Sequence, residues 1–287
     1  MKNKIITIML ILMLIIGLSL LLYPTVSNYL NQLNQTWIIA EYTDTVSGIN
    51  AQKYQQIIDS ATEYNEQLKS KNNRWIMSET DRELYEQQLN VTTSGAISYI
   101  EIPKIECSLP IYRGSGNVIL QNAVGHVEGS SLPVGGLGTH CVLSGHRGLP
   151  SAELFSRLDE LVKGDLFYIQ TLDQMLVYEV DQITVVLPDE LEELNIVDDK
   201  DYCTLVTCTP YGINSHRLLV RGTRIELPEE NSIIDSDSQM NNQKQEEKGP
   251  NCVLMISLVA AFATTVLIVI FVVFKFRVRR GKYENRN

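Results

Sequence analysis

The chain has 287 residues, of which 44% are apolar and 20% are charged, and its formal net charge is −10. This length allows one or two domains, and the apolar fraction excludes a wholly disordered chain. The sequence has no collagen-like, heptad or solenoid period, which excludes a fibre or a repeat array, and five cysteines are too few for a small disulfide-dense scaffold.

The N-terminus predicts a membrane anchor. Residues 1–4 carry Lys2 and Lys4, and residues 5–23 form an uncharged apolar run of nineteen residues. A helix of this length spans a hydrocarbon core of about 30 Å. Because no A-x-A-like cleavage site follows the run, an uncleaved anchor is favoured over a signal peptide.

A second predicted transmembrane helix lies near the C-terminus, at residues 251–274, and a basic tail follows at 275–287. Basic residues flank the outer ends of both runs, so the positive-inside rule places both termini in the cytoplasm and predicts a two-pass protein of the cell membrane. The segment between the runs is then extracellular. Residues 24–250 hold 16 Lys and Arg against 33 Asp and Glu, which argues against nucleic acid as a partner.

Residues 24–94 are expected to form a helical extension. One apolar stripe recurs at steps of three and four residues, at Tyr54, Ile57, Ile58, Ala61, Tyr64 and Leu68. Asn72-Asn73 interrupts the pattern, the apolar patch Trp75–Met77 follows, and a second helical stretch runs from Ser78 to Leu89.

The sequence pattern changes at residue 95, and residues 95–228 are predicted to form one mainly β domain. Short β-rich runs alternate with Gly and Pro, as in a barrel or a sandwich, at 97–102, 139–144, 166–170, 175–187, 202–207 and 217–225. Two short helical stretches are expected around 152–161 and 190–194. Residues 229–250 are polar and read as a flexible linker to the second membrane run.

Three side chains stand where β runs end. Cys208 closes one run, and Arg217 opens the next, so a hairpin between them would bring the thiol near a guanidinium that stabilises the thiolate and an oxyanion. His146 follows the run 139–144 and could exchange protons with a leaving or incoming amine. These residues alone are weak evidence, since a buried structural cysteine is the commoner case. The four histidines have no metal-ligand spacing with cysteine, so no metal is predicted.

Three sequence blocks carry a resemblance to the sortases, the membrane-anchored cysteine transpeptidases of Gram-positive bacteria. They are TLVTCTPYGINSHRLLVRG at 204–222, LSGHRGLPSAELFSRLDELVKGDLFYI at 143–169 and GHVEGSSLPVGGLGTH at 125–140. The residues of these blocks resemble those of class C, the pilin-polymerising branch. The resemblance covers roughly residues 95–228 and implies a closed eight-stranded β-barrel with short helices.

The resemblance also implies residue roles: Cys208 as nucleophile, His146 as catalytic histidine and Arg217 as catalytic arginine. It implies cleavage of an LPXTG-like sorting signal between Thr and Gly, a thioester on Cys208, and transfer to a lysine amine of another pilin subunit. Pilin subunits or surface proteins with such signals would be the partners. No cofactor is expected, because the thioester keeps the energy of the cleaved peptide bond.

Three further residues are assigned by similarity. Thr207 and Arg147, which adjoin the predicted nucleophile and histidine, are expected to contact substrate. Class C sortases usually carry an Asp-Pro-aromatic lid before the barrel, and here Asn72–Met77 has Trp75 but no Asp-Pro. Trp75 is expected either to plug the groove as a lid or to pack the helical extension against the barrel. Direct roles are not expected for His126, His140 or His216.

Two other functions remain open. A housekeeping-type sortase would share all three predicted catalytic residues and would attach surface proteins to cell-wall peptidoglycan. A non-catalytic, membrane-tethered assembly scaffold could have kept the barrel alone. The helical extension and the C-terminal apolar run favour pilin polymerisation over wall anchoring, and the presence of Cys208, His146 and Arg217 argues against the scaffold.

Overall fold

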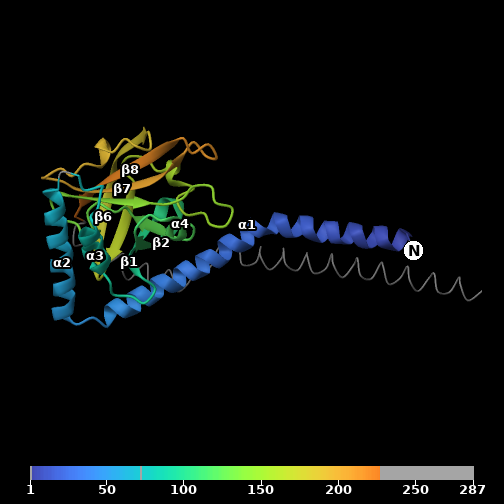
Figure 1. Cartoon of the computed structure of the whole chain (residues 1–287), viewed down its shortest axis with the longest axis horizontal. Helices are drawn as coiled ribbons and strands as arrows, with labels where there is room; N and C mark the ends of the chain where they lie inside the picture. The colour runs from blue at the N-terminus through green and yellow to red at the C-terminus, as the bar shows by residue number, and fades with distance from the viewer. Residues whose placement is uncertain (1, 72, 227–287) are drawn as a thin grey trace, which may run out of the picture. The chain divides into compact units, whose positions relative to one another are not determined.

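A computed structural model describes residues 2–71 and 73–226 (Figure 1). The chain divides into two units, and residues 27–228 form the one that contains the barrel. The predicted linker at 229–250, the second membrane run at 251–274 and the basic tail lie outside the described residues. Within them, one helix is long and apolar enough to cross a membrane, with a mean hydropathy of 3.1 over eighteen residues near its N-terminus.

This helix, α1, runs from Lys2 to Ser47 without a break at Pro24, so it extends well past the predicted anchor boundary at residue 23. A proline removes one helical hydrogen bond but need not end a helix that is held elsewhere. The later part of α1 is held by the barrel unit. Asn31 donates to the carbonyl of Ser151, Gln35 donates to that of Asn122, and the buried Tyr42 hydroxyl donates to that of Ile97.

Two shorter helices follow, as expected. In α2 (Ala51–Lys69) the Asn50 side chain caps the N-terminus, and Ala61, Tyr64 and Leu68 of the predicted stripe are buried against the barrel core. α3 (Glu79–Gln87) begins with a reciprocal capping box between Ser78 and Asp81. Between the two helices, the loop 70–78 contains Trp75.

The prediction of a closed eight-stranded barrel is confirmed. Its strands are β1 (Ala96–Ile102), β2 (Cys107–Arg113), β3 (Val124–His126), β4 (Thr139–Ser144), β5 (Leu166–Thr171), β6 (Gln174–Val186), β7 (Asp201–Thr209) and β8 (His216–Ile225). Around the barrel they follow the order β1-β2-β3-β4-β7-β8-β6-β5. Neighbouring strands pair antiparallel except β2 with β3 and β4 with β7, which are parallel.

The sequence pattern missed two strands and misjudged the short helices. β2 contains Pro110, and β3 is only three residues long with a central glycine, so neither presents a β-rich run. The helical stretches expected around 152–161 and 190–194 are single 3-10 turns, η2 (Leu158–Glu160) and η3 (Glu192–Leu194). Two further short helices, η1 (Pro103–Ile105) and α4 (Asn117–Leu120), were not expected.

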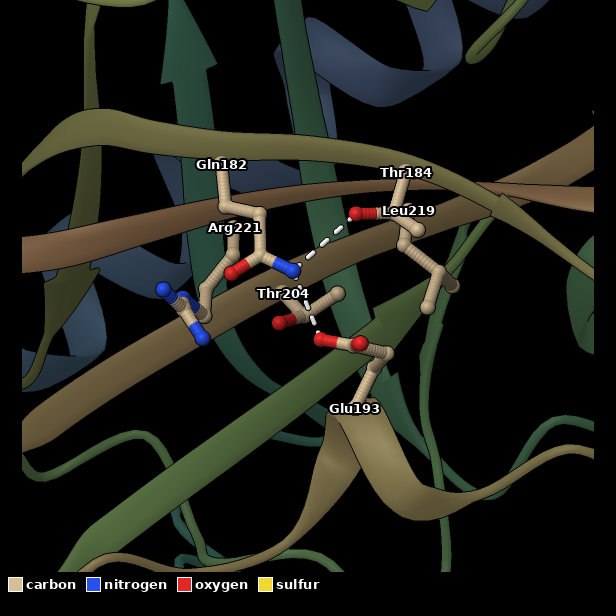
Figure 2. Close-up of a pocket in the computed structure, with 6 residues that line it drawn as sticks. All are labelled: Gln182, Thr184, Glu193, Thr204, Leu219 and Arg221. Carbon is tan, nitrogen blue, oxygen red and sulfur yellow. Dashed lines mark hydrogen bonds between the residues drawn. The ribbon is translucent and has the colours of Figure 1, made fainter.

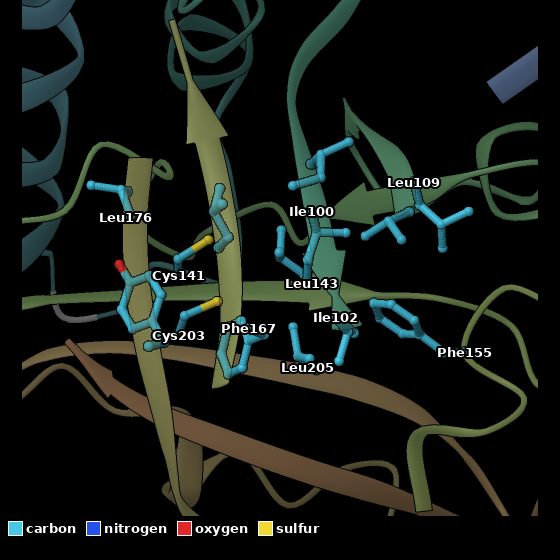
Figure 3. Packing of buried hydrophobic residues seen from close by; sticks show 14 of the residues in the cluster. Ile100, Ile102, Leu109, Cys141, Leu143, Phe155, Phe167, Leu176, Cys203 and Leu205 are labelled. Carbon is cyan, nitrogen blue, oxygen red and sulfur yellow. The ribbon is translucent and has the colours of Figure 1, made fainter. Parts of the chain in front are cut away.

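The main core fills the barrel interior. Figure 3 shows Ile100, Leu143 and Leu205 pointing inward together, with Phe155 and Phe167 beside them. Cys141 and Cys203 are register partners on the parallel strands β4 and β7, and both are buried in this core. Both act as small core residues of the barrel.

A second, smaller apolar cluster covers the outer face of the same strands. We call Val142, Val186, Leu194 and Leu219 the outer cluster; Val206, Leu191 and Trp75 pack against it. Side chains alternate along a strand, so Val142 and Val206 point away from the barrel core that holds Cys141 and Leu205. The cluster joins the sheet to the β6–β7 connection and to the loop 70–78.

Candidate active site

Cys208 and Arg217 face each other across one strand pair. They are direct register partners of β7 and β8, and Val186 of β6 is the partner of Arg217 on the other side. Directly opposed residues of antiparallel strands have Cβ atoms about 4.5–5.5 Å apart on one face. The hairpin expected from the sequence therefore brings the predicted nucleophile and the predicted arginine together, on the face that bears the outer cluster.

His146 reaches the same level from the other side of β7. β4 runs parallel to β7, with Ser144 the partner of Val206, and the amide of Gly145 donates to the carbonyl of Val206 at 3.0 Å. Cys208 lies two residues beyond Val206 on β7, and His146 lies two residues beyond the end of β4, in the loop that follows this strand. The register thus pairs Cys208 with Arg217 and places the loop of His146 beside β7. We call His146, Cys208 and Arg217 the row; each of them is partly exposed.

Backbone carbonyls hold the guanidinium of Arg217. Its Nη1 donates to the carbonyls of Asn214 and His216, at 3.2 and 3.1 Å. These bonds tie the side chain to the β7–β8 turn beside Cys208. The remaining guanidinium N–H groups can serve an anionic group at the thiol, since arginine has five donors in a fixed fork.

Arg147 is nine-tenths buried next to this row, with a side-chain exposure of 10%. It forms an ion pair with Asp159, its Nη1 lies 3.4 Å from Thr209 Oγ1, and its guanidinium carbon lies 5.9 Å from the ring centre of Tyr211. Its Nε is buried without a partner among the described residues. Arg147 therefore links the loop after β4 to the residues that follow Cys208.

Thr207 lies on the other face of β7. It is buried, and its hydroxyl donates to the carbonyl of Gly145 at 2.8 Å. In this position Thr207 acts on the site through the backbone that precedes His146. The expected direct contact between its side chain and substrate stays a prediction.

Trp75 packs on the face that carries the row. It contacts the outer cluster together with Val206, which is two residues before Cys208 on the same side of β7. The guanidinium carbon of Arg74 lies 4.5 Å from the Trp75 ring centre, and Arg74 donates to the carbonyl of Leu194 in η3. The loop 70–78 is thereby seated on the barrel.

The groups flanking the row are structural. His140 is held between the Asn195 carbonyl and Thr204 Oγ1, at 2.8 and 2.7 Å, and burial lowers its pKa to about 4. His126 bonds the hydroxyl of Tyr85 and the carbonyl of Ser131. Cross-strand register pairs His216 with Thr209, on the face opposite Arg217. That none of the three histidines acts directly stays a prediction.

Further along the same face, a shallow pocket lies two register pairs beyond Cys208. Its lining is mixed polar and apolar and consists of Gln182, Thr184, Glu193, Thr204, Leu219 and Arg221 (Figure 2). Gln182 donates to both Thr184 and Glu193, which joins β6 to η3. Arg221 makes a two-point ion pair with Asp181, so it is a fixed, half-buried charge.

Sequence reasoning missed several residues of this region. Asp159 and Tyr211 contact Arg147 because the tertiary fold brings them to it. Arg74 stacks on the ring of its chain neighbour Trp75 because of the path of the loop. The sole available signal was their place within the family-like blocks or beside Trp75. No spacing rule relates Asp159 to Arg147 before the loop conformation is known.

Comparisons with known proteins identify the family of the chain. The sortase-domain family model matches residues 100–225. Sortase D of Bacillus subtilis is 30% identical over 149 residues, which cover 51% of this chain and 72% of that protein.

Among solved structures, sortase C1 of Streptococcus agalactiae is 50% identical with a TM-score of 0.65, over 67% of this chain and 99% of that one. Sortase C of Streptococcus pneumoniae is 46% identical with a TM-score of 0.59, over 66% and 97%. Clostridium perfringens sortase C, solved with the C-terminal cell wall sorting motif, is 43% identical with a TM-score of 0.59, over 67% and 100%. The barrel, the sequence blocks and these neighbours together show that the chain belongs to the sortase family, in its class C branch.

Proposed function

We propose that this sortase cleaves an LPXTG-like sorting signal between Thr and Gly and transfers the new carboxyl end to a lysine amine of another pilin subunit. The observation that carries the proposal is the register pairing of Cys208 with Arg217, beside the loop of His146 that the hydrogen bond from Gly145 to Val206 holds against β7. The solved relatives support the substrate class, since one contains a sorting motif and another is described in terms of pilin substrate specificity.

In the first step, the Cys208 thiolate attacks the carbonyl carbon of the signal's threonine. Arg217 donates hydrogen bonds to the oxyanion that forms. The carbon–nitrogen bond to glycine then breaks, and the His146 imidazolium gives its proton to the departing amine. The threonine carbonyl remains on Cys208 as a thioester.

In the second step, an uncharged lysine amine attacks the thioester carbonyl. His146, now neutral, takes the proton that the amine loses, and the thiolate leaves with Arg217 beside it. One amide bond is broken and one isopeptide bond is made, so the reaction needs neither a redox nor a nucleotide cofactor. His146 regains in the second step the proton that it gives up in the first, so the pair returns to its starting state after each cycle.

Two neighbours would position this machinery. Arg147 spans from Asp159 to Thr209 and Tyr211, and thereby orders the chain on either side of the row. Thr207 fixes Gly145, the residue before His146. We assign Arg147 to the edge of the substrate groove and Thr207 to the alignment of His146 with Cys208.

The loop 70–78 would act as the lid. A substrate strand that lies along the face from Cys208 towards Val206 meets the Trp75 ring, because Trp75 packs against the same apolar cluster. Trp75 would then fill both roles expected from the sequence. The contacts that fasten the helical extension to the barrel would also cover the groove. Arg74, bonded to η3, would replace the missing Asp-Pro as the anchor of the lid.

The domain plan follows the same proposal. The apolar start of α1 would anchor the chain, the barrel at 95–228 would lie outside the cell membrane, and the linker at 229–250 would lead to the second span at 251–274. Both termini would then be cytoplasmic. Alkylation of single cysteines placed at residue 3 and in the basic tail, before and after permeabilising the cells, tests this topology.

The function itself is tested by intact mass spectrometry of the detergent-solubilised full chain mixed with an LPXTG peptide. A mass gain equal to the acyl part of the peptide is expected, and it should be absent in Cys208→Ala. Adding a lysine amine should release the adduct as an isopeptide product. Release only by a peptidoglycan-type amine would identify the cell-wall enzyme, and the absence of any adduct across several sorting signals would favour the scaffold.

A further inference from the structure

The second half of β6 has a neighbouring strand on one side only. β5 pairs with Gln174–Glu179, and the bonds between Gly164, Asp165 and Val180 extend that contact to residue 180. From Gln182 to Val186, the register continues with β8 alone. Among the described residues, no backbone hydrogen bond reaches 182–186 from the other side. This stretch, which we call the β6 edge, therefore has backbone donors and acceptors free to pair with a further strand.

The β6 edge exposes apolar side chains. Ile183, Val185 and the following Leu187 are exposed by 37%, 55% and 45%. Ile183 and Val185 share one face of the strand by alternation. Proteins usually block such an edge with lysine, proline or a bulge. Here a register shift between Val180 and Gln182 precedes the edge, but residues 182–186 themselves pair regularly with β8 and contain neither lysine nor proline. An extended peptide with apolar residues at alternate positions matches this surface.

The segment that follows the edge is strongly acidic. Residues 187–200 contain six carboxylates against Lys200 alone: Asp189, Glu190, Glu192, Glu193, Asp198 and Asp199. All six are exposed, and none forms an ion pair with Lys or Arg within residues 2–71 and 73–226. A surface of this charge attracts cationic segments and raises their rate of encounter.

The edge ends beside the row of Cys208. Val186 is the register partner of Arg217, and Arg217 is the partner of Cys208. Two strand spacings, about 10 Å, separate Val186 from Cys208. A chain docked along the edge therefore leaves it close to the site of the thioester.

We infer that the β6 edge and the acidic segment 187–200 dock the lysine-bearing acceptor by strand addition. The inference rests on the proposed function, because it names where that reaction's second substrate binds. An added strand lies three spacings, about 14 Å, from β7, beyond the reach of a lysine within the docked residues. The reactive lysine must therefore follow the docked segment, where the acceptor crosses Val186 towards Cys208.

The test uses the full chain in detergent and two acceptor probes. One is a synthetic peptide with alternating valines followed by a single lysine, and the other is N-acetyl-lysine amide, which cannot add as a strand. Thioester formation with an LPXTG peptide is measured first, and its release by each probe is measured second. We expect kcat/KM for the strand peptide to exceed that for the amide at least tenfold.

Val185→Lys should lower kcat/KM for the strand peptide at least tenfold, by removing an apolar contact and repelling a cationic acceptor. Thioester formation and its release by hydroxylamine should not change. Val162→Lys is the matched control, because Val162 is 54% exposed and lies outside the edge. Ile183→Lys provides a second edge variant in case Val185→Lys does not fold.

Equal use of the two probes by the native chain would overturn the inference. So would native kcat/KM for the strand peptide in an edge variant that forms the thioester normally. These outcomes leave the first reaction step intact. Failure of the native chain to form any thioester would instead overturn the proposed function, and the docking site with it.

Discussion

Replacing Trp75 with alanine measures how far the loop 70–78 protects Cys208. The Trp75 ring packs against the outer cluster next to Val206. If the ring buries about 120 Å² of apolar area, its contribution at about 25 cal/mol/Å² is about 3 kcal/mol. The stacked Arg74 guanidinium adds about 0.5–1 kcal/mol. Each 1.4 kcal/mol is a factor of ten in the equilibrium between the closed and the open loop. Loss of both contributions could therefore raise the open population by at most a few hundredfold to a thousandfold.

The expected change is smaller than this limit, because Arg74 still bonds the Leu194 carbonyl in the variant and Lys71 still pairs with Asp81 across the loop. We expect iodoacetamide to alkylate Cys208 about 10- to 100-fold faster in Trp75→Ala than in the native chain. Fragment-ion mass spectrometry of the peptide that contains Cys208 provides the rate and separates alkylation of Cys208 from that of Cys203, five residues away. Trp37→Ala is the matched control, since this second tryptophan is 64% exposed in α1.

A second variant moves the loop without changing Trp75. A Cβ on Gly129 would lie 2.3 Å from the carbonyl oxygen of Arg74, and Gly129 has a φ of +85°. Gly129→Ala must therefore displace the loop, and we expect faster alkylation of Cys208 in this variant too. Rates within twofold of the native chain in both variants would show that Trp75 fastens the extension to the barrel and does not gate the thiol.

Three other predictions concern the surroundings of the row. A Cβ on Gly145 would lie 2.6 Å from the fully buried Phe155 ring. Gly145→Ala should therefore destabilise the fold by about 1–3 kcal/mol and slow thioester formation. The control Gly48→Ala makes ordinary contacts only and should leave the melting temperature within about 2 °C of the native value. Burial lowers the pKa of His140 to about 4 from its usual 6.5. Between these two values the unfolded chain binds a proton at His140 that the folded chain does not bind. The free energy of unfolding therefore falls as the pH drops, by about 2 kcal/mol between pH 7 and pH 5. Urea unfolding should detect this loss, and an equal loss in His140→Gln would refute the assignment. Arg147→Lys should lower kcat/KM for the sorting peptide about tenfold through the contacts to Asp159, Thr209 and Tyr211, and an unchanged value would remove Arg147 from the groove.

Local sequence determines part of this protein directly. The nineteen-residue apolar run makes the start of α1 hydrophobic whatever lies around it, and the stripe through Tyr64 and Leu68 specifies a helix with one buried face. Cys208 and Arg217 are also a local pair. They lie at matching positions of one hairpin, so their approach follows from strand alternation and a short turn.

The tertiary structure alone determines the rest of the site. The loop of His146 lies beside the strand of Cys208 because β4 and β7 pair in parallel, although the paired residues of these strands are 62 positions apart in the sequence. Arg147 finds Asp159 and Tyr211 through loop conformation, and Trp75 reaches the outer cluster through the path of the loop between α2 and α3. The open β6 edge arises because the antiparallel β5 begins opposite Glu179 and does not extend along residues 182–186. Such contacts depend on which distant segments pack against each other in the folded chain. The periodicity of residues within one segment does not specify that packing partner.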